Sequence, residues 1–185
     1  MIESPVTTDE AMLFLRVDGG ADSAEYSLVE SLVSAATDYA STVTRRKFLT
    51  ETVTETFDNF PAVIRPRFSP LVSITSIAYT DSGNAPQTLA ATAYDADTTM
   101  QPGRVFLKYN QTWPDSLGIQ NAVTLTYTAG YGATANLVPE GLKTAIKMLV
   151  SHWYEHRETA AEKQLMTIPL AVESLLWQHR IPEIG

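Results

Sequence analysis

Residues 122–158 read AVTLTYTAGYGATANLVPEGLKTAIKMLVSHWYEHRE, and this stretch decides the fold because it joins a strand to a long helix. From Ala122 to Thr128 apolar residues alternate with threonines, a period of two that predicts a half-buried strand. Gly130 and Gly132 end this strand, since glycine adopts backbone angles that other residues avoid.

The second half of the stretch predicts the longest amphipathic helix after residue 100. Pro139 lies where a helix can begin, because the first helical turn has no partner for the N–H group that proline lacks. Helical spacing then gathers apolar side chains on one face, which we expect to form a wall of the core. The residues of this face are Leu142, Ala145, Ile146, Leu149, Val150, Trp153 and Tyr154.

Two further helices are expected before residue 48. Thr7 and Glu10 have the spacing of a capping box, which predicts a short helix from about Thr8 to Val17. Apolar residues at helical spacing then predict a long helix from about Ser23 to Arg45. It ends in three cations that suit the negative end of the helix dipole, Arg45, Arg46 and Lys47.

Residues 48–128 predict a small antiparallel sheet or open barrel inserted between helices. They are rich in Thr, Val, Ile, Phe and Tyr and are broken by prolines and glycines, which is typical of strands and turns. Residues 81–84, Asp-Ser-Gly-Asn, predict a hairpin turn. A single sheet, a barrel and a sandwich all fit this pattern. The expected strands are Glu51–Phe57, Ala62–Arg65, Val72–Thr80, Gln87–Leu89, Arg104–Tyr109 and Ala122–Thr128.

The chain closes with a polar loop over Thr159–Thr167 and a last helix from Pro169 to Arg180. The predicted fold class is therefore α+β. A helical layer contains two N-terminal helices, one long C-proximal helix and one short terminal helix, and an antiparallel β block is inserted in it. We expect a single domain over residues 1–185, with a β subdomain over 48–128 and a C-terminal arm over 159–185.

The composition and charge of the chain argue against several classes of function. The 185 residues are 44% hydrophobic and 18% charged, as in an ordinary globular protein, and no apolar run has the length of a membrane span. The N-terminus lacks the apolar core of an export signal, and the absence of cysteine excludes disulfides and cysteine-ligated metals. The formal charge is -8, and the first 30 residues hold seven acidic side chains against Arg16 alone. Such a surface disfavours tight DNA binding.

One group of side chains, within residues 152–156, has the pattern of a metal site. His152, Glu155 and His156 form a His-x-x-Glu-His pattern, in which two histidines one helical turn apart grip zinc beside a glutamate base. A metal-dependent hydrolase is therefore an alternative function. A catalytic zinc needs a third protein ligand, and the short remainder of the chain has no second motif that resembles one. We therefore expect no metal, no cofactor and no enzymatic activity.

The order of several segments resembles one family. The N-terminal helices contain TTDEAMLFLRVD and LVESLVSAATDYASTVTRRKF, and the β block contains SPLVSITSIAYTDSGN and YNQTWPD. The chain closes with VTLTYTAGYG, VPEGLKTAIKMLVSHWYEHRE and IPLAVESLLWQHRI. Nearly the whole chain is similar to the head–tail connector (head completion, or adaptor) proteins of long-tailed double-stranded DNA phages and prophages.

The resemblance implies a structural virion protein in the phage neck, assembled in the host cytoplasm. It implies a ring of about twelve copies between the portal protein and the tail, which extends the DNA channel and docks a tail, stopper or tail-terminator protein. DNA would pass without sequence-specific binding, and no membrane would take part. Another head–tail joining component, such as a stopper, is a second alternative, although the long helices argue against a mostly β protein.

The resemblance also implies that the C-terminal segment holds the portal or a neighbouring copy. The opposing interpretation is that this segment packs back on its own core. The expected contact residues are Leu170, Leu175, Leu176, Trp177 and Ile181.

Overall fold

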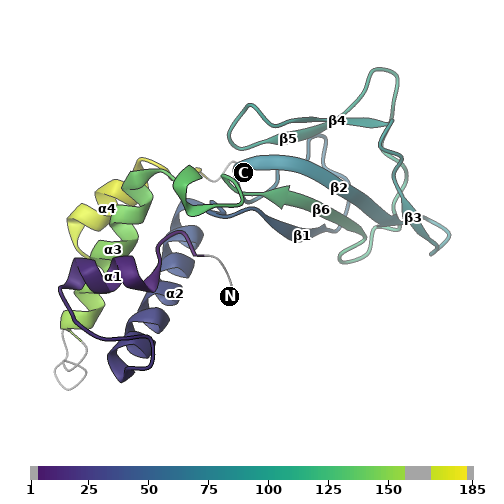
Figure 1. Ribbon diagram of the computed structural model, residues 1–185. Helices are drawn as coiled ribbons and strands as arrows, with labels where there is room; N and C mark the ends of the chain where they lie inside the picture. Colours follow the sequence, from purple (N-terminus) through teal and green to yellow (C-terminus); the bar gives the residue numbers. More distant parts are fainter. Residues whose placement is uncertain (1–3, 157–167, 183–185) are drawn as a thin grey trace. The chain divides into compact units, whose positions relative to one another are not determined.

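The computed structural model describes residues 4–156 and 168–182. The chain divides into two compact units (Figure 1). The helical unit comprises Met1–Leu49 and Gly132–Gly185, and the β unit comprises Thr50–Tyr131. Four α-helices and antiparallel strands confirm the predicted α+β class, while the single-domain organisation stays a prediction. No helix among the described residues is long and apolar enough to cross a membrane.

The first helix, α1 (Thr8–Leu15), begins at the predicted capping box. The Thr7 hydroxyl accepts a hydrogen bond from the Glu10 backbone N–H at 3.1 Å, and the Thr7 N–H donates to the Glu10 carboxylate at 3.0 Å. The helix ends at Arg16, whose φ of 57° is left-handed. This helix is two residues shorter than expected, because a left-handed residue cannot continue a right-handed helix.

Helix α2 (Ala24–Thr44) confirms the predicted long helix almost to the residue. The Ser23 hydroxyl caps it by accepting from the Tyr26 N–H at 3.1 Å, and Arg45 ends it in the left-handed region. One face of the helix is buried and packs chiefly against α3. The buried residues of this face are Val29, Val33, Ala36, Ala40 and Thr44.

Helix α3 (Glu140–Glu155) is the predicted core wall. It follows a short 3₁₀ turn, η1 (Ala135–Leu137), and starts directly after Pro139. Its buried residues are Leu142, Ala145, Ile146, Leu149 and Val150. The final helix, α4 (Leu170–Trp177), packs on α3 and α2 and is shorter than the predicted span of Pro169–Arg180. The predicted loop over Thr159–Thr167 lies outside the described residues.

The aromatic pair at the end of α3 is anchored within the helical unit. The Tyr154 hydroxyl donates a hydrogen bond to the Glu25 carboxylate at 2.9 Å. The Trp153 ring meets the Tyr39 ring edge to face, with 6.4 Å between ring centres. Such pairs add about 0.5–1.5 kcal/mol beyond burial, so these contacts fix α3 against α2.

The β unit contains a four-stranded antiparallel sheet in the order β1-β6-β2-β3. Its strands are β1 (Glu51–Phe57), β2 (Leu71–Thr80), β3 (Pro86–Thr88) and β6 (Val123–Ala129). A separate hairpin pairs β4 (Tyr94–Asp97) with β5 (Arg104–Leu107).

Strand β6 lies in the middle of the sheet and alternates as predicted. Val123, Leu125 and Tyr127 are fully buried, whereas the threonines between them are half-buried. These side chains form a core with residues of β2, β5 and the intervening loops. An aromatic group borders that core, where Phe60 stacks on Trp113 with 4.9 Å between ring centres.

One predicted strand was wrong, and one strand of the structure was not predicted. Ala62–Arg65 forms only one bridge, between Ile64 and Val105, because prolines at 61 and 66 leave too little chain for a ladder. Strand β4 was missed, since its sequence Tyr-Asp-Ala-Asp has low strand propensity.

The hairpin turn predicted at 81–84 is confirmed. The Asp81 carboxylate accepts hydrogen bonds from the Gly83 and Ala85 N–H groups, each at 2.9 Å. Asn84 adopts the left-handed φ that such a turn needs.

Candidate interaction surface

The C-terminal segment packs on its own helical unit. The Ile181 N–H donates to the Thr44 carbonyl at 3.0 Å, so the chain after α4 is held at the C-terminal end of α2. The Arg46 guanidinium donates to the His179 carbonyl at the same end. Helix α4 therefore ends beside the cations that follow α2.

The predicted contact residues differ in their exposure. Leu176 and Ile181 are buried in the helical unit, with 1% and 5% of their surfaces exposed, so they contact their own chain. Leu175 is half-buried. Leu170 and Trp177 point outward, with 82% and 61% exposed. Helical periodicity causes this difference, because an eight-residue helix that buries one face must present the other face to solvent.

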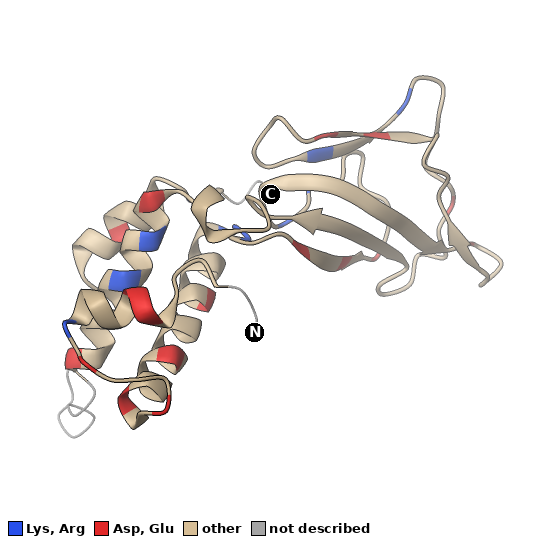
Figure 2. Ribbon diagram, in the orientation of Figure 1, with Lys and Arg blue, Asp and Glu red and all other residues tan. Residues whose placement is uncertain are grey.

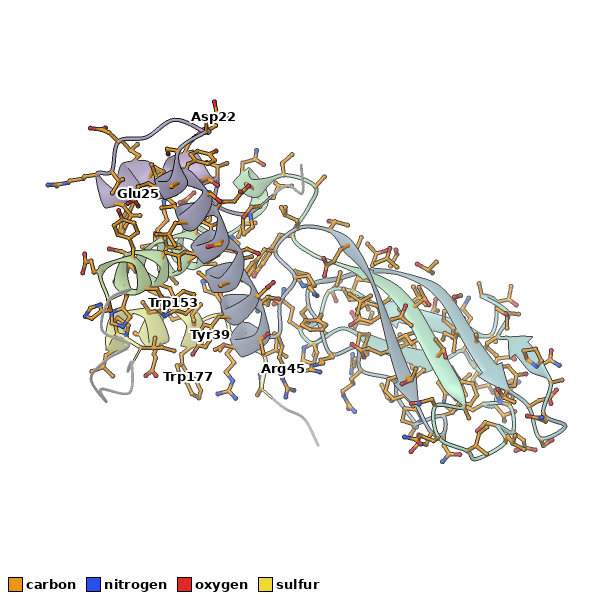
Figure 3. All side chains as sticks on the ribbon, turned by 90° about the horizontal axis from the view of Figure 1, so that it is seen from below. Asp22, Glu25, Tyr39, Arg45, Trp153 and Trp177 are labelled. Atoms are coloured by element: carbon orange, nitrogen blue, oxygen red, sulfur yellow. The ribbon has the colours of Figure 1, made fainter. Side chains whose placement is uncertain are left out.

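An aromatic and basic group lies at the end of α4. The Arg180 guanidinium stacks on the exposed Trp177 ring, 4.6 Å from its centre. Figure 3 shows Trp177 and Arg45 at the same end of the helical unit. We call Trp177 and Arg180 the knob. A cation over an indole ring is stabilised by about 0.5–1 kcal/mol at an exposed site, so the two side chains favour one shared geometry.

A shallow hollow of about 300 Å³ lies where α1, the C-terminal half of α3 and the start of α4 meet. Among the described residues, its apolar lining is formed by Phe14, Met148 and Pro169. Its polar side consists of Ser151, His152 and Glu155, with Glu155 exposed to solvent.

The exposed face of α1 was not predicted from the sequence to be a contact surface. Leu13 and Phe14 are 81% and 46% exposed, while their neighbours Ala11 and Met12 are buried. Five consecutive apolar residues, 11–15, were the available signal. On a helix such a run extends around the circumference, so part of it must face away from the core.

The charges of the helical unit are separated along α2. Acidic side chains crowd α1 and the start of α2, and cations follow the end of α2 (Figure 2). Figure 3 shows Asp22 and Glu25 at the end opposite to Arg45 and Trp177. This arrangement complements the helix dipole, which explains the charges but not the exposed apolar side chains.

The two histidines of the His-x-x-Glu-His pattern lie in the last turn of α3 and at its C-terminal end. The His152 and His156 rings lie 4.5 Å apart between centres, and His156 Nδ1 lies 2.8 Å from the His152 carbonyl oxygen. A donated hydrogen bond at that distance caps the last turn of α3. Within residues 4–156 and 168–182, no group of three His, Cys, Asp or Glu side chains lies close enough to hold a metal ion. The described residues therefore supply no third ligand.

The β unit contains one polar cluster in its interior. The Tyr127 hydroxyl donates to the Glu55 carboxylate and accepts from the Phe68 N–H at 3.1 Å. The same carboxylate accepts from the Arg67 N–H at 3.0 Å. Burial raises the pKa of Glu55 and also that of Tyr127, to which the neighbouring carboxylate contributes. The cluster attaches the 67–68 backbone to β1 and β6, a structural role.

The fold and these surfaces are those of a structural protein that acts through contacts with other chains. A family model described as head completion protein matches residues 6–180, and the chain belongs to this family. The predicted resemblance and the structural head–tail connector function are thereby confirmed.

Solved structures share the fold. A chain from the virion of a native gene transfer agent particle has a TM-score of 0.77 at 18% identity, with 98% of this chain and 92% of that chain covered. A chain from the neck of an empty particle of this kind, computed with C6 symmetry, has a TM-score of 0.76 at 20% identity, with the same coverage. A chain from the neck of a native particle, computed with C12 symmetry, has a TM-score of 0.67 at 17% identity and covers 85% and 84%. No curated protein matched the sequence.

Proposed function

We propose that the chain forms a closed ring in the neck of a phage-like particle, between the portal and the tail. The observation that carries this proposal is the family match over residues 6–180, which spans both units. The ring extends the DNA channel and gives the tail or a stopper protein its docking surface. Its function is assembly, without catalysis and without a cofactor.

The copy number is proposed by analogy with the particles in which the same fold occurs. Similar chains are found in necks computed with C6 and C12 symmetry, which supports a ring of about twelve copies. A closed ring of identical chains needs heterologous contacts, in which one face of a subunit meets a different face of the next. The helical unit offers two patches for such a contact, since the hollow and the knob involve different residues.

The C-terminal arm contributes to these contacts through its outward side chains. Leu170 and Trp177 remain the candidates for a portal or neighbour contact, because Leu176 and Ile181 are already buried. DNA passes through the channel without sequence-specific binding. The acidic excess of the chain supports this, since like charge keeps phosphates from binding tightly.

Electron microscopy of the purified chain, alone and with its portal, tests the proposal. We expect ring-shaped particles with a central hole and about a dozen copies, counted independently by native mass spectrometry. A chain that stays monomeric both alone and in the presence of the portal would falsify the ring.

A further inference from the structure

We infer that neighbouring copies meet head to tail, with the Trp177–Arg180 knob of one copy seated in the Phe14 hollow of the next. The occupant of the hollow is thus a second copy of this chain. The inference rests on the proposed ring, because it names the two surfaces through which adjacent copies of that ring touch.

The knob has the chemistry of an interface anchor. Trp177 is 61% exposed, although tryptophan is the side chain with most apolar surface to bury. Arg180 stacks on its ring, which limits the conformations of both side chains before any partner arrives. Tryptophan and arginine are the residues most enriched where truncation costs an interface most, and side chains already ordered lose less entropy on binding.

The hollow fits this knob in size and chemistry. About 300 Å³ is the lower end of ligand-pocket volumes, so it suits one aromatic side chain rather than a whole helix. Phe14, Met148 and Pro169 offer the indole ring an apolar wall. Glu155 lines the same hollow from the exposed end of α3, where its carboxylate can accept hydrogen bonds from the incoming Arg180.

Charge decides which ends of the helical unit can meet. Acidic side chains outnumber the single cation, Arg16, on α1, which carries Phe14, and on its connection to α2: Asp9, Glu10, Asp18 and Asp22. Three cations follow the C-terminal end of α2, where Figure 3 shows Arg45 at the same end as Trp177: Arg45 and Lys47 are half-buried, and the buried Arg46 donates to the His179 carbonyl. Contact between two like ends would oppose like charges, whereas head-to-tail contact pairs opposite ones.

Helix α4 separates the two features within one chain. Pro169 lines the hollow just before α4, and Trp177 is the last residue of that helix. Eight residues of helix correspond to about 12 Å, and the exposure of Trp177 shows that it does not fill the hollow of its own chain. Knob and hollow are thus two different patches of the surface, as a heterologous ring contact requires.

A mixing experiment tests the inference. Trp177→Glu removes the knob and leaves the hollow, whereas Phe14→Glu spoils the hollow and leaves the knob. We expect each variant alone to associate at least ~30-fold more weakly than the natural chain, the loss typical of an interface hot spot. Mixed together, the two variants retain one working interface and should form 1:1 dimers that grow no further, detected by native mass spectrometry.

Matched controls carry the same chemical change outside these surfaces. Phe106 lies in β5 and is 38% exposed, and Tyr109 follows that strand and is 92% exposed. Tyr109→Glu and Phe106→Glu should leave rings intact. Circular dichroism melting of every variant separates loss of assembly from loss of folding.

A charge exchange gives a second readout on exposed side chains. Arg180→Glu and Glu155→Arg should each weaken association roughly tenfold, and the double variant should recover most of that loss. Rings that persist in both single-face variants, or a mixture that yields no dimers, would overturn the head-to-tail contact and leave the ring itself standing. A natural chain that forms no ring, alone or with portal, would instead count against the proposed function.

Discussion

The helical unit and the β unit are held together in different ways. The helical unit encloses an apolar core made by helices far apart in sequence. The β unit is one continuous segment whose sheet is supplemented by an interior polar cluster around Glu55 and Tyr127. A cavity should therefore damage the first unit, while loss of a hydrogen bond or a change of pH should damage the second.

The largest effect is expected from a cavity in the helical unit. Leu149 on α3 is fully buried, so Leu149→Ala should lower the free energy of unfolding by about 2–5 kcal/mol. Hydrogen exchange followed by mass spectrometry should show faster exchange in α2, α3 and α4 and little change in the β unit. Equal loss of protection in β1, β2 and β6 would contradict the separation of the two units.

The control for this cavity is a leucine in the same unit. Leu170 is 82% exposed, so Leu170→Ala should change the free energy of unfolding by less than about 0.5 kcal/mol.

A smaller effect is expected from the polar cluster of the β unit. Tyr127→Phe removes the hydroxyl that joins Glu55 to the Phe68 N–H, and it leaves both polar groups short of a partner. We expect a loss of about 1–3 kcal/mol in urea unfolding, with faster exchange confined to the β unit. Tyr109→Phe, at a side chain that is 92% exposed, should have no measurable effect. Equal losses from both substitutions would mean that the hydroxyl network contributes nothing.

The smallest effect is a pH dependence of the same unit. Burial raises the pKa of Glu55 above its ordinary value of 4.5, although hydrogen bonds from Tyr127 and Arg67 oppose the shift. A carboxyl with a raised pKa binds its proton more tightly in the folded state. Its contribution to stability is therefore present below 4.5 and is lost as pH rises through the raised value.

Comparison with Glu55→Gln isolates this titration, because the other carboxyl groups are common to both chains. Between about pH 7 and about pH 4, the free energy of unfolding of the natural chain should rise relative to that of the variant. A difference that stays constant over this range would show that Glu55 titrates alike in the folded and unfolded chains.

The elements with strong periodic patterns were predictable from the sequence. Strand β6 alternates apolar residues with threonines, and α3 has an uninterrupted apolar face, so both follow from side-chain spacing alone. The C-terminal boundary of α1 was harder, because this helix ends at Arg16 in a left-handed conformation. Glycine and asparagine are the residues that usually predict this conformation, so the sequence did not predict it at an arginine.

The candidate surface was only partly predictable. The family resemblance indicated the C-terminal segment as a contact region, but only tertiary packing decides that Leu176 turns inward and Trp177 outward. The hollow was not predictable, since Phe14, Met148 and Pro169 come from three distant parts of the chain. Strand β4 was missed for a related reason. The Asp97 carboxylate forms an ion pair with Arg104 of β5 at 2.8 Å, and the strand propensity of a single segment does not account for a contact between two strands.

The pairing of Glu51 with Ala129 has a consequence for synthesis on the ribosome. About 95 residues separate the end of α2 from the start of α3, so at 5–20 residues per second the apolar face of α2 waits roughly 5–20 s for its main partner. The β unit is complete before α3 emerges. Once β1 and β6 pair, the two ends of the insertion lie about 5 Å apart, and a long loop closure becomes a short one. The inserted sheet thus delays the packing of α3 on α2, and its paired end strands then shorten the loop that separates the two helices.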